Sequence, residues 1–211
     1  MAVEELPLRP DFEVATPPEV AALLEDADER IREWFSRRED RSVSGFVPSD
    51  YPSAWRALCA VADLGLDPGL FLEWGSGFGV VTAMASILGH EAHGIEIDSD
   101  LAERARDLVD EHAPDASIHF GSYFPNGFDA VEDDDEFLSV LPGPAAYDDV
   151  GHEVRDFDVV YVFPWPGTES MHLELFDRTA SPGAILVSHQ GLEGTHVLRK
   201  TDGVPSLDDF A

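Results

Sequence analysis

The chain has little positive charge. Of its 211 residues, 13 are Lys or Arg, and the only lysine is Lys200. Against 43 acidic residues this gives a formal net charge of −30. A field of that sign repels phosphate backbones and anionic membranes, so neither nucleic acid nor a membrane is an expected partner. An acidic, lysine-poor surface is also typical of proteins adapted to high salt, although high genomic G+C content would equally favour Arg over Lys.

Cysteine and long apolar runs are scarce as well. Cys59 is the only cysteine, which excludes an internal disulfide framework and a cysteine-based zinc cluster. No window holds about 18 uninterrupted apolar residues, and the N-terminus lacks the pattern of a signal peptide. We therefore expect a soluble, cytoplasmic protein. Its 44% hydrophobic residues are sufficient for one domain with a substantial core.

Short apolar runs alternate with amphipathic segments through most of the chain. The predicted strands are 70–73, 92–97, 117–120, 157–163 and 184–188. The predicted helices between them are 80–88, 101–112 and 169–180, the second with a D-x-x-E start at Asp100 and Glu103. This alternation predicts an α/β fold: a three-layer, doubly wound, mostly parallel sheet covered by helices on both faces.

The two ends of the chain differ from this regular part. Residues 1–50 are expected to precede the main domain at 51–211 as a leader and an amphipathic helix. Apolar residues recur at helical spacing from residue 19 to about 38, so this helix is expected to pack on the core. A second helix is expected at about 54–64. At the other end, 195–200 predicts one edge strand, which makes the C-terminal strands abbreviated.

The most informative segment is FLEWGSGFG, from Phe71 to Gly79, followed by Glu96 in GIEID. Alternate glycines let a backbone turn sharply and approach a ligand, and an acid ending the next strand can accept hydrogen bonds from both ribose hydroxyls. The pattern therefore indicates an adenosine-containing ligand. A dinucleotide site would require glycine at the sixth place of G-x-G-x-x-G, where this chain has Val80. The lysine of a P-loop is also missing.

With Glu73 two residues before the first glycine, this segment resembles motif I of the class I S-adenosylmethionine-dependent methyltransferases. The resemblance covers about residues 46–200 and implies S-adenosyl-L-methionine as cofactor. It also implies methyl transfer to an unidentified small-molecule or protein acceptor. In that family the glycine loop passes beneath the methionine half, the acid of motif I faces the cofactor amino group, and the acid ending the second strand holds the ribose. The implied cofactor-binding residues are Glu73, Gly75, Ser76, Gly77, Gly79, Glu96, Ile97 and Ser122.

The sequence departs from the family pattern after two strands. Ser122 stands where an acid or amide usually addresses the adenine amino group, and either its side chain or backbone groups would take that role. Phe163 stands where amino methyltransferases often carry an Asn or Asp that accepts a hydrogen bond from the target nitrogen. These departures keep a second hypothesis open, a non-catalytic cofactor-binding or partner-binding relative of the fold.

Candidate residues for the chemistry follow the fourth and fifth strands. Trp165, between two prolines, is expected either to flank the methyl acceptor or to pack a turn. His189, at the end of the fifth strand, is the best-placed base for an acceptor that must lose a proton. Weaker candidates are Asp50, Tyr51 and His172. No metal ligands are expected, because the acidic run 132–136 lacks the glycine turn and ligand spacing of an EF-hand.

Overall fold

The computed structural model describes residues 2–7, 14–37, 45–128, 144–191 and 194–202. Its strands are β1 (Val3–Glu5), β2 (Leu70–Trp74), β3 (Glu91–Glu96), β4 (Ser117–Phe120), β5 (Val159–Val162), β6 (Ile185–His189) and β7 (Thr195–Lys200). Its helices are α1 (Pro18–Ser36), α2 (Tyr51–Ala62), α3 (Val80–Ile87), α4 (Ser99–His112), α5 (Tyr147–Val150), the 3₁₀ helix η2 (Val154–Asp156) and α6 (Glu169–Thr179).

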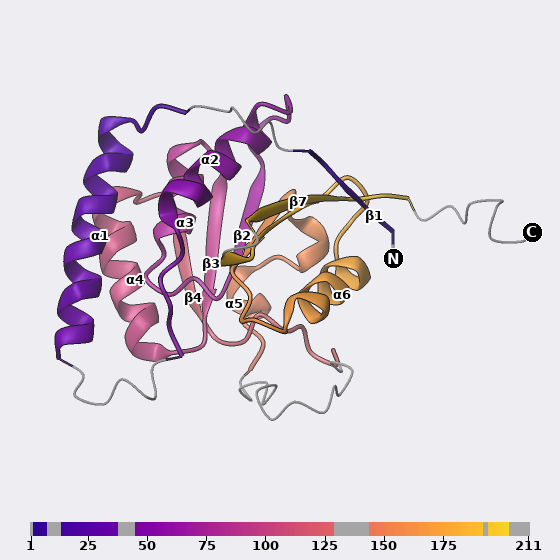
Figure 1. Ribbon diagram of the computed structural model, residues 1–211. Coiled ribbons are helices and arrows are strands. Elements are labelled where there is room, and N and C mark those ends of the chain that lie inside the picture. The colour runs from indigo at the N-terminus through magenta and orange to yellow at the C-terminus, as the bar shows by residue number, and fades with distance from the viewer. Residues whose placement is uncertain (1, 8–13, 38–44, 129–143, 192–193, 203–211) are drawn as a thin grey trace, which may run out of the picture.

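In the described residues the seven strands form one sheet in the order β1-β7-β6-β5-β2-β3-β4 (Figure 1). The five strands from β4 to β6 pair in parallel, and β7 pairs antiparallel with β6. This confirms the predicted α/β fold with a mostly parallel sheet. The strands that follow β2 lie on both sides of it: β3 and β4 on one side, β5 and β6 on the other. The strand order therefore reverses at β2, and ligands of such sheets bind beyond the carboxyl ends of the strands at this point.

Helices cover both faces of the sheet because neighbouring strand residues point to opposite sides. Phe71 belongs to a buried apolar cluster that includes side chains of α1 to α4, whereas Leu72 belongs to a second cluster with side chains of α5, η2 and α6. On the first face α3 lies against the sheet, and α1 lies outside it, in contact with α3 and α4 (Figure 1). Among the helices of the described ranges, none has both the length and the apolar content that a bilayer crossing requires.

The strand β1 was not predicted. Val3 to Glu5 pair antiparallel with Lys200 to Leu198, and the N–H of Leu6 donates to the carbonyl of Val197 at 2.7 Å. The predicted strand at 195–200 is confirmed as β7, but it is not the edge strand, because β1 pairs with its outer side from Leu198 to Lys200. The sequence VEE carries no alternation of apolar and polar residues, so nothing local identifies it as a strand.

Two helices start earlier than predicted from the sequence. α4 begins at Ser99, and the carboxylate of Asp98 accepts hydrogen bonds from the N–H groups of Asp100 and Leu101, so Asp98 rather than Asp100 is the cap. α2 begins at Tyr51, because the carboxylate of Asp50 caps it through the N–H of Ser53. β5 is shorter than the predicted strand 157–163, beginning at Val159 and ending at Val162. The acidic run 132–136 lies outside the described residues.

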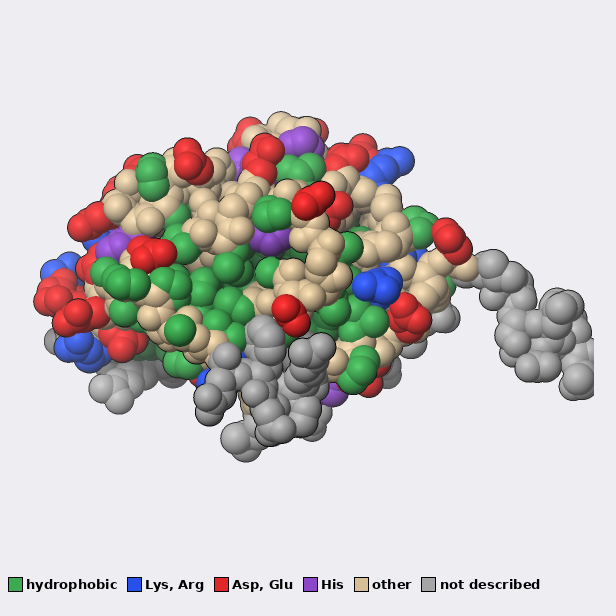
Figure 2. Space-filling model, turned by 90° about the horizontal axis from the view of Figure 1, so that it is seen from above, with side chains coloured by type: hydrophobic (Ala, Val, Ile, Leu, Met, Phe, Trp, Pro, Cys, Tyr) green, Lys and Arg blue, Asp and Glu red, His purple; other side chains and the backbone are tan. Residues whose placement is uncertain are grey.

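The excess of acid is visible on the surface. Figure 2 shows one face of the molecule, on which acidic side chains cluster along the rim and basic ones are few. Hydrophobic side chains lie between them. Acidic side chains are thus part of the folded surface on this face.

Candidate functional site

The glycine loop connects β2 to α3. The N–H groups of Gly75 and Ser76 both donate to the carbonyl of Ile95, at 3.0 and 2.9 Å, which draws the loop across the end of β3. Gly75, Gly77 and Gly79 have φ angles of 75°, 54° and 74°. These left-handed conformations are costly for residues with a Cβ, so the turn requires glycine at these positions.

Two buried carboxylates flank this loop. Oε2 of Glu73 accepts hydrogen bonds from the N–H and the hydroxyl of Thr82 on α3, at 2.8 and 2.5 Å. Glu96 accepts from the N–H of Gly77 at 2.7 Å and, through its other oxygen, from the N–H of Asp98 at 2.9 Å. Burial raises the pKa of Glu73 to about 8 and also raises the pKa of Glu96. The hydrogen bonds hold both carboxylates in position. A cation placed beside them would lower their pKa values and favour the charged forms.

A cavity of about 780 Å³ opens over the carboxyl ends of the central strands. Six of the predicted cofactor-binding residues line it: Glu73, Gly75, Ser76, Glu96, Ile97 and Ser122. A methyl group on Gly75 would meet no atom within 4 Å, so this part of the loop faces open space. The volume lies within the range of small-molecule sites.

Gly77 and Gly79 are not among the described lining residues. A Cβ on Gly77 would lie 2.4 Å from Cε2 of Phe46, and one on Gly79 would lie 3.1 to 3.3 Å from side chains of α4 and β4. The structure thus gives these two glycines a packing reason in addition to their φ angles. Phe46 itself lines the cavity, so the loop is covered at Gly77 by a side chain of the segment that precedes α2.

The charge of the cavity is one-sided. Its acidic lining residues, within the described ranges, are Glu73, Glu96 and Glu169, and no Lys or Arg is among them. Such a lining disfavours pyrophosphate and phosphate groups and favours a ligand that carries positive charge. A sulfonium with an α-ammonium group fits this lining, and a ribose fits Glu96, so the residues present are suited to S-adenosylmethionine.

Aromatic side chains form another wall of the cavity. The ring of Tyr123 is stacked on that of Trp74, with centroids 5.8 Å apart. Its hydroxyl donates to Nε2 of His172 at 3.0 Å, and Nδ1 of His172 donates to the carbonyl of Thr168 at 2.8 Å. Burial raises the pKa of Tyr123 and lowers the pKa of His172, so this pair is a neutral hydroxyl donating to a neutral imidazole.

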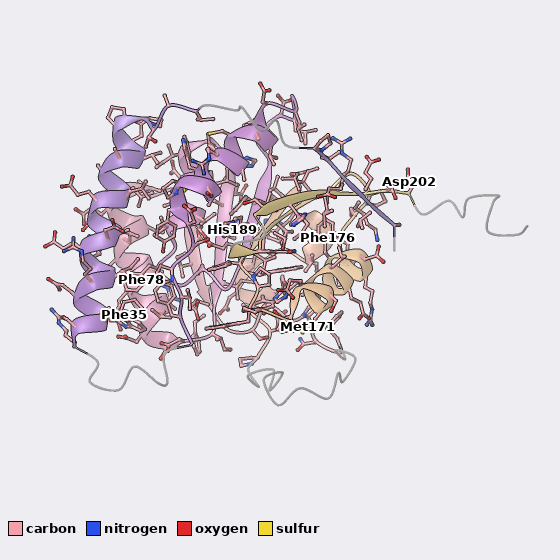
Figure 3. The ribbon with its side chains drawn as sticks, in the orientation of Figure 1. Phe35, Phe78, Met171, Phe176, His189 and Asp202 are labelled. Carbon is pink, nitrogen blue, oxygen red and sulfur yellow. The ribbon has the colours of Figure 1, made fainter. Side chains whose placement is uncertain are left out.

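The structure separates the two residues predicted for the chemistry. Trp165 lines the cavity and is 51% exposed. His189 is 3% exposed, its Nδ1 lies 2.9 Å from Oγ1 of Thr195, and its ring packs 5.2 Å from that of Phe163. It is not among the described lining residues. In Figure 3 it lies near β7, whereas the cavity-lining Met171 lies lower, on α6.

Two groups of residues were not assigned a role from the sequence. The segment before α2 forms a second wall, in which Ser49 and Tyr161 share a hydrogen bond of 2.7 Å between their hydroxyls. Gly94 lies beneath the glycine loop, where a Cβ would come within 2.6 Å of Oγ1 of Thr82 and 2.8 Å of Cβ of Ser76. A glycine inside a strand signals such a close approach, but the segment before α2 carries no comparable signal.

No family model and no curated protein matches the chain by sequence. Solved structures do match it. An RNA methyltransferase from Salinibacter ruber, in complex with S-adenosyl-L-homocysteine, is similar over 76% of this chain and 97% of its own, with 22% identity and a TM-score of 0.53. An O-methyltransferase from Bacillus cereus, also in complex with S-adenosyl-L-homocysteine, is similar over 84% and 68%, with 14% identity and a TM-score of 0.50. The chain has the class I methyltransferase fold.

Proposed function

We propose that this chain is an S-adenosylmethionine-dependent methyltransferase whose acceptor is a small molecule with a flat, apolar body. The observation that carries the proposal is the convergence of Glu73 and Glu96 on a glycine loop, at a cavity that has no Lys or Arg among its described lining residues. The two similar structures contain S-adenosyl-L-homocysteine, which supports this choice of cofactor.

The proposed cofactor contacts follow from the positions of the acids. Glu96 would accept hydrogen bonds from the ribose hydroxyls, and Glu73 would face the α-ammonium group across the open space above Gly75. Ile97 and Ser122 lie further along the same wall, where the adenine would bind. When bound, the cofactor supplies an electrophilic methyl group, so the protein has only to align the acceptor and exclude water.

The proposed acceptor is inferred from the apolar side chains that line the cavity. Phe124, Phe163, Trp165 and Met171 present apolar surface to the cavity, and the exposed ring of Trp165 offers a flat face for a planar acceptor. The chain's negative charge disfavours a polyanionic acceptor. Where the acceptor must lose a proton, we propose the Tyr123–His172 pair in preference to His189, because both members of the pair line the cavity.

Titration calorimetry tests the cofactor first. We expect S-adenosylhomocysteine to bind with one site per chain and NAD not to bind. Absence of S-adenosylhomocysteine binding would overturn the proposal. Transfer of a labelled methyl group is then measured with planar aromatic hydroxyl and amine compounds, and in parallel with RNA and with a protein extract. Methylation confined to the small molecules supports the proposed acceptor class, whereas methylation of RNA or protein alone contradicts it.

A second function is favoured by one observation. Phe163, which cannot accept a hydrogen bond, occupies the end of β5 where amino methyltransferases often bind the target nitrogen. A relative that binds the cofactor without turnover would show this feature. Binding of S-adenosylhomocysteine without methyl transfer over a broad acceptor panel would support that second function. A cytoplasmic location remains a prediction from the sequence.

A further inference from the structure

Three potential metal ligands meet away from the cavity. They are Glu91 and His93 on β3 and His152 between α5 and η2, and one donor atom of each lies within 4.8 Å of the other two. None of the three lines the cavity described above. Glu91 and His93 are two positions apart on β3, whereas His152 is far from them in the sequence, so no local spacing indicates the cluster.

His93 has an imidazole nitrogen with no partner. His93 is on β3, which lies between β2 and β4 in the sheet. The residue is 8% exposed, and its Nε2 is buried without a hydrogen-bond partner in the structure. The nearest carboxylate oxygen, on Glu91, is 3.7 Å away, which is too far for a hydrogen bond. An unsatisfied buried nitrogen destabilises the fold, so a ligand that accepts its lone pair would remove that penalty.

His119 fixes which nitrogen of His93 is available. Nδ1 of His93 lies 3.1 Å from Nε2 of His119, and the two rings stack with centroids 5.3 Å apart. When Nδ1 of His93 carries the proton and donates it to His119, Nε2 presents its lone pair toward Glu91 and His152. A partner that orients a ligating histidine through its other nitrogen is the usual arrangement at protein metal sites.

We propose that Glu91, His93 and His152 bind a divalent transition metal, with Zn²⁺ as the best match, and that His119 is a positioning residue for His93. Two imidazoles and one carboxylate are a donor set that Zn²⁺ accepts, with a water molecule in the fourth position. Glu91 is largely exposed, so the ion can enter from solvent and the water can remain. Calcium and magnesium are disfavoured because they require oxygen ligands.

A metal at this place would have a structural consequence. His152 follows α5, and Tyr147 at the start of α5 donates to the carbonyl of Tyr123 at 2.6 Å while accepting from the indole N–H of Trp74 at 3.2 Å. The metal would therefore tie β3 to the segment that supports the aromatic wall of the cavity. We expect it to stabilise the fold without contacting the cofactor.

A second cluster in the molecule serves as the control. Asp26, Glu111 and His112 also bring donor atoms within 4.8 Å of one another. There, however, Arg30 already supplies the cation: it donates to Asp26 at 3.0 Å and to Glu111 at 2.5 Å. His112 lies 2.8 Å from Asp26. These groups have partners, so this cluster is an ion-pair network and not a second proposed site.

The test uses the full chain, stripped of metal by a chelator and kept in molar potassium chloride to suppress nonspecific cation binding. Calorimetry with Zn²⁺ should show one site. His152→Ala and Glu91→Gln, which alter half-buried and exposed side chains, should each weaken binding at least tenfold. His112→Ala should leave the dissociation constant within twofold of that of the unchanged protein.

Two further measurements examine geometry and positioning. Co²⁺ in place of Zn²⁺ should give the intense visible absorption of a four-coordinate site, and His152→Ala should lose it. His119→Phe should weaken Zn²⁺ binding by roughly 10–100-fold, and His119→Gln, whose amide oxygen can accept from His93, should restore most of that loss. Absence of stoichiometric binding, binding that His152→Ala leaves intact, or binding that His112→Ala abolishes would each overturn the proposal.

Discussion

Oε2 of Glu96 lies 2.7 Å from the backbone nitrogen of Gly77 and accepts its hydrogen bond. The acid that ends β3 is thereby fastened to the middle of the glycine loop. A carboxylate oxygen can accept more than one hydrogen bond, so this contact still leaves capacity for a ribose hydroxyl. The two halves of the sequence motif are thus one structural unit, and removing the acid should affect both the ligand and the loop.

Glu96→Ala should weaken S-adenosylhomocysteine binding by about 1.5–3 kcal/mol, the range for hydrogen bonds to a charged group. It should also lower the melting temperature, because the N–H groups of Gly77 and Asp98 lose their acceptor. Calorimetry and thermal unfolding measure the two effects. Glu103→Ala, which removes an exposed acid of α4, is the matched control and should change neither. Unaltered affinity in Glu96→Ala would refute the ribose assignment.

Substitutions at two glycines of the loop should separate stability from binding. Gly77→Ala places a Cβ 2.4 Å from Cε2 of Phe46 at a φ of 54°, so we expect a loss of stability of about 2 kcal/mol or more. Gly75→Ala has a similar φ but points into open space beside the cavity, so it should cost about 1 kcal/mol of stability and mainly weaken S-adenosylhomocysteine binding.

Urea unfolding and calorimetry on both glycine variants check this difference. Phe46→Leu in the Gly77→Ala background should recover part of the lost stability, because the smaller side chain relieves the clash and leaves only the cost of the φ angle. Equal stability loss in the two single variants would contradict the role assigned to Phe46.

Most of the fold could be predicted because its signals are local. The parallel strands are short apolar runs bounded by turn residues, and the helix α4 between two of them has one apolar face. The strand β1 could not be predicted, because its three residues become a strand only through pairing with β7, almost two hundred positions later.

The site was predictable to a similar extent. The glycine loop and Glu96 lie within one strand-turn-helix-strand unit, so their spacing in sequence fixes their meeting in space. The placement of Phe46 over Gly77 depends on a contact between two such units and leaves no sequence signal. For His189, the strand end was predicted correctly, but its ring is buried against Thr195 and Phe163 and is not among the described lining residues of the cavity. Its role as base stays a prediction that this geometry does not favour.

The raised pKa of Glu73 should make stability depend on pH. Its pKa is about 8 in the folded protein against 4.5 for an ordinary glutamate, so the folded state holds this proton more tightly than the unfolded state does. The stabilisation is complete below pH 4.5 and is lost as the pH rises to about 8.

Comparison with Glu73→Gln isolates this group. Between pH 4.5 and 8 the unfolding free energy of the unchanged protein should fall relative to that of the variant by up to about 1.4 kcal/mol per pH unit, and the difference should level off at higher pH. Urea unfolding at several pH values, without ligand, measures it. A constant difference through this window would show that Glu73 titrates like an ordinary glutamate.

Trp165→Ala should reduce methyl transfer at least tenfold while changing S-adenosylhomocysteine affinity by less than about twofold. Because Trp165 is 51% exposed, its removal should cost little stability. The variant is compared with the unchanged protein in calorimetry, thermal unfolding and labelled methyl transfer. If Trp165 only packs the turn, the melting temperature, affinity and turnover should fall together, and a stable, fully active variant would exclude both roles.

Stability should rise with salt. A folded chain with a net charge of −30 concentrates repulsion that an expanded chain relieves, and the Debye length falls from about 10 Å at 0.1 M to about 3 Å at 1 M. Salt also weakens favourable pairs such as Arg37 with Glu33, but exposed pairs contribute little individually, and the chain has far more acids than cations to pair with them. Repulsion therefore dominates, and the melting temperature should increase from low to molar potassium chloride.

Neutralising the exposed acids Glu29, Glu103 and Asp107 to their amides should make this increase smaller. A melting temperature that stays flat or falls over the same range would remove the interpretation of the acidic surface as an adaptation to high salt.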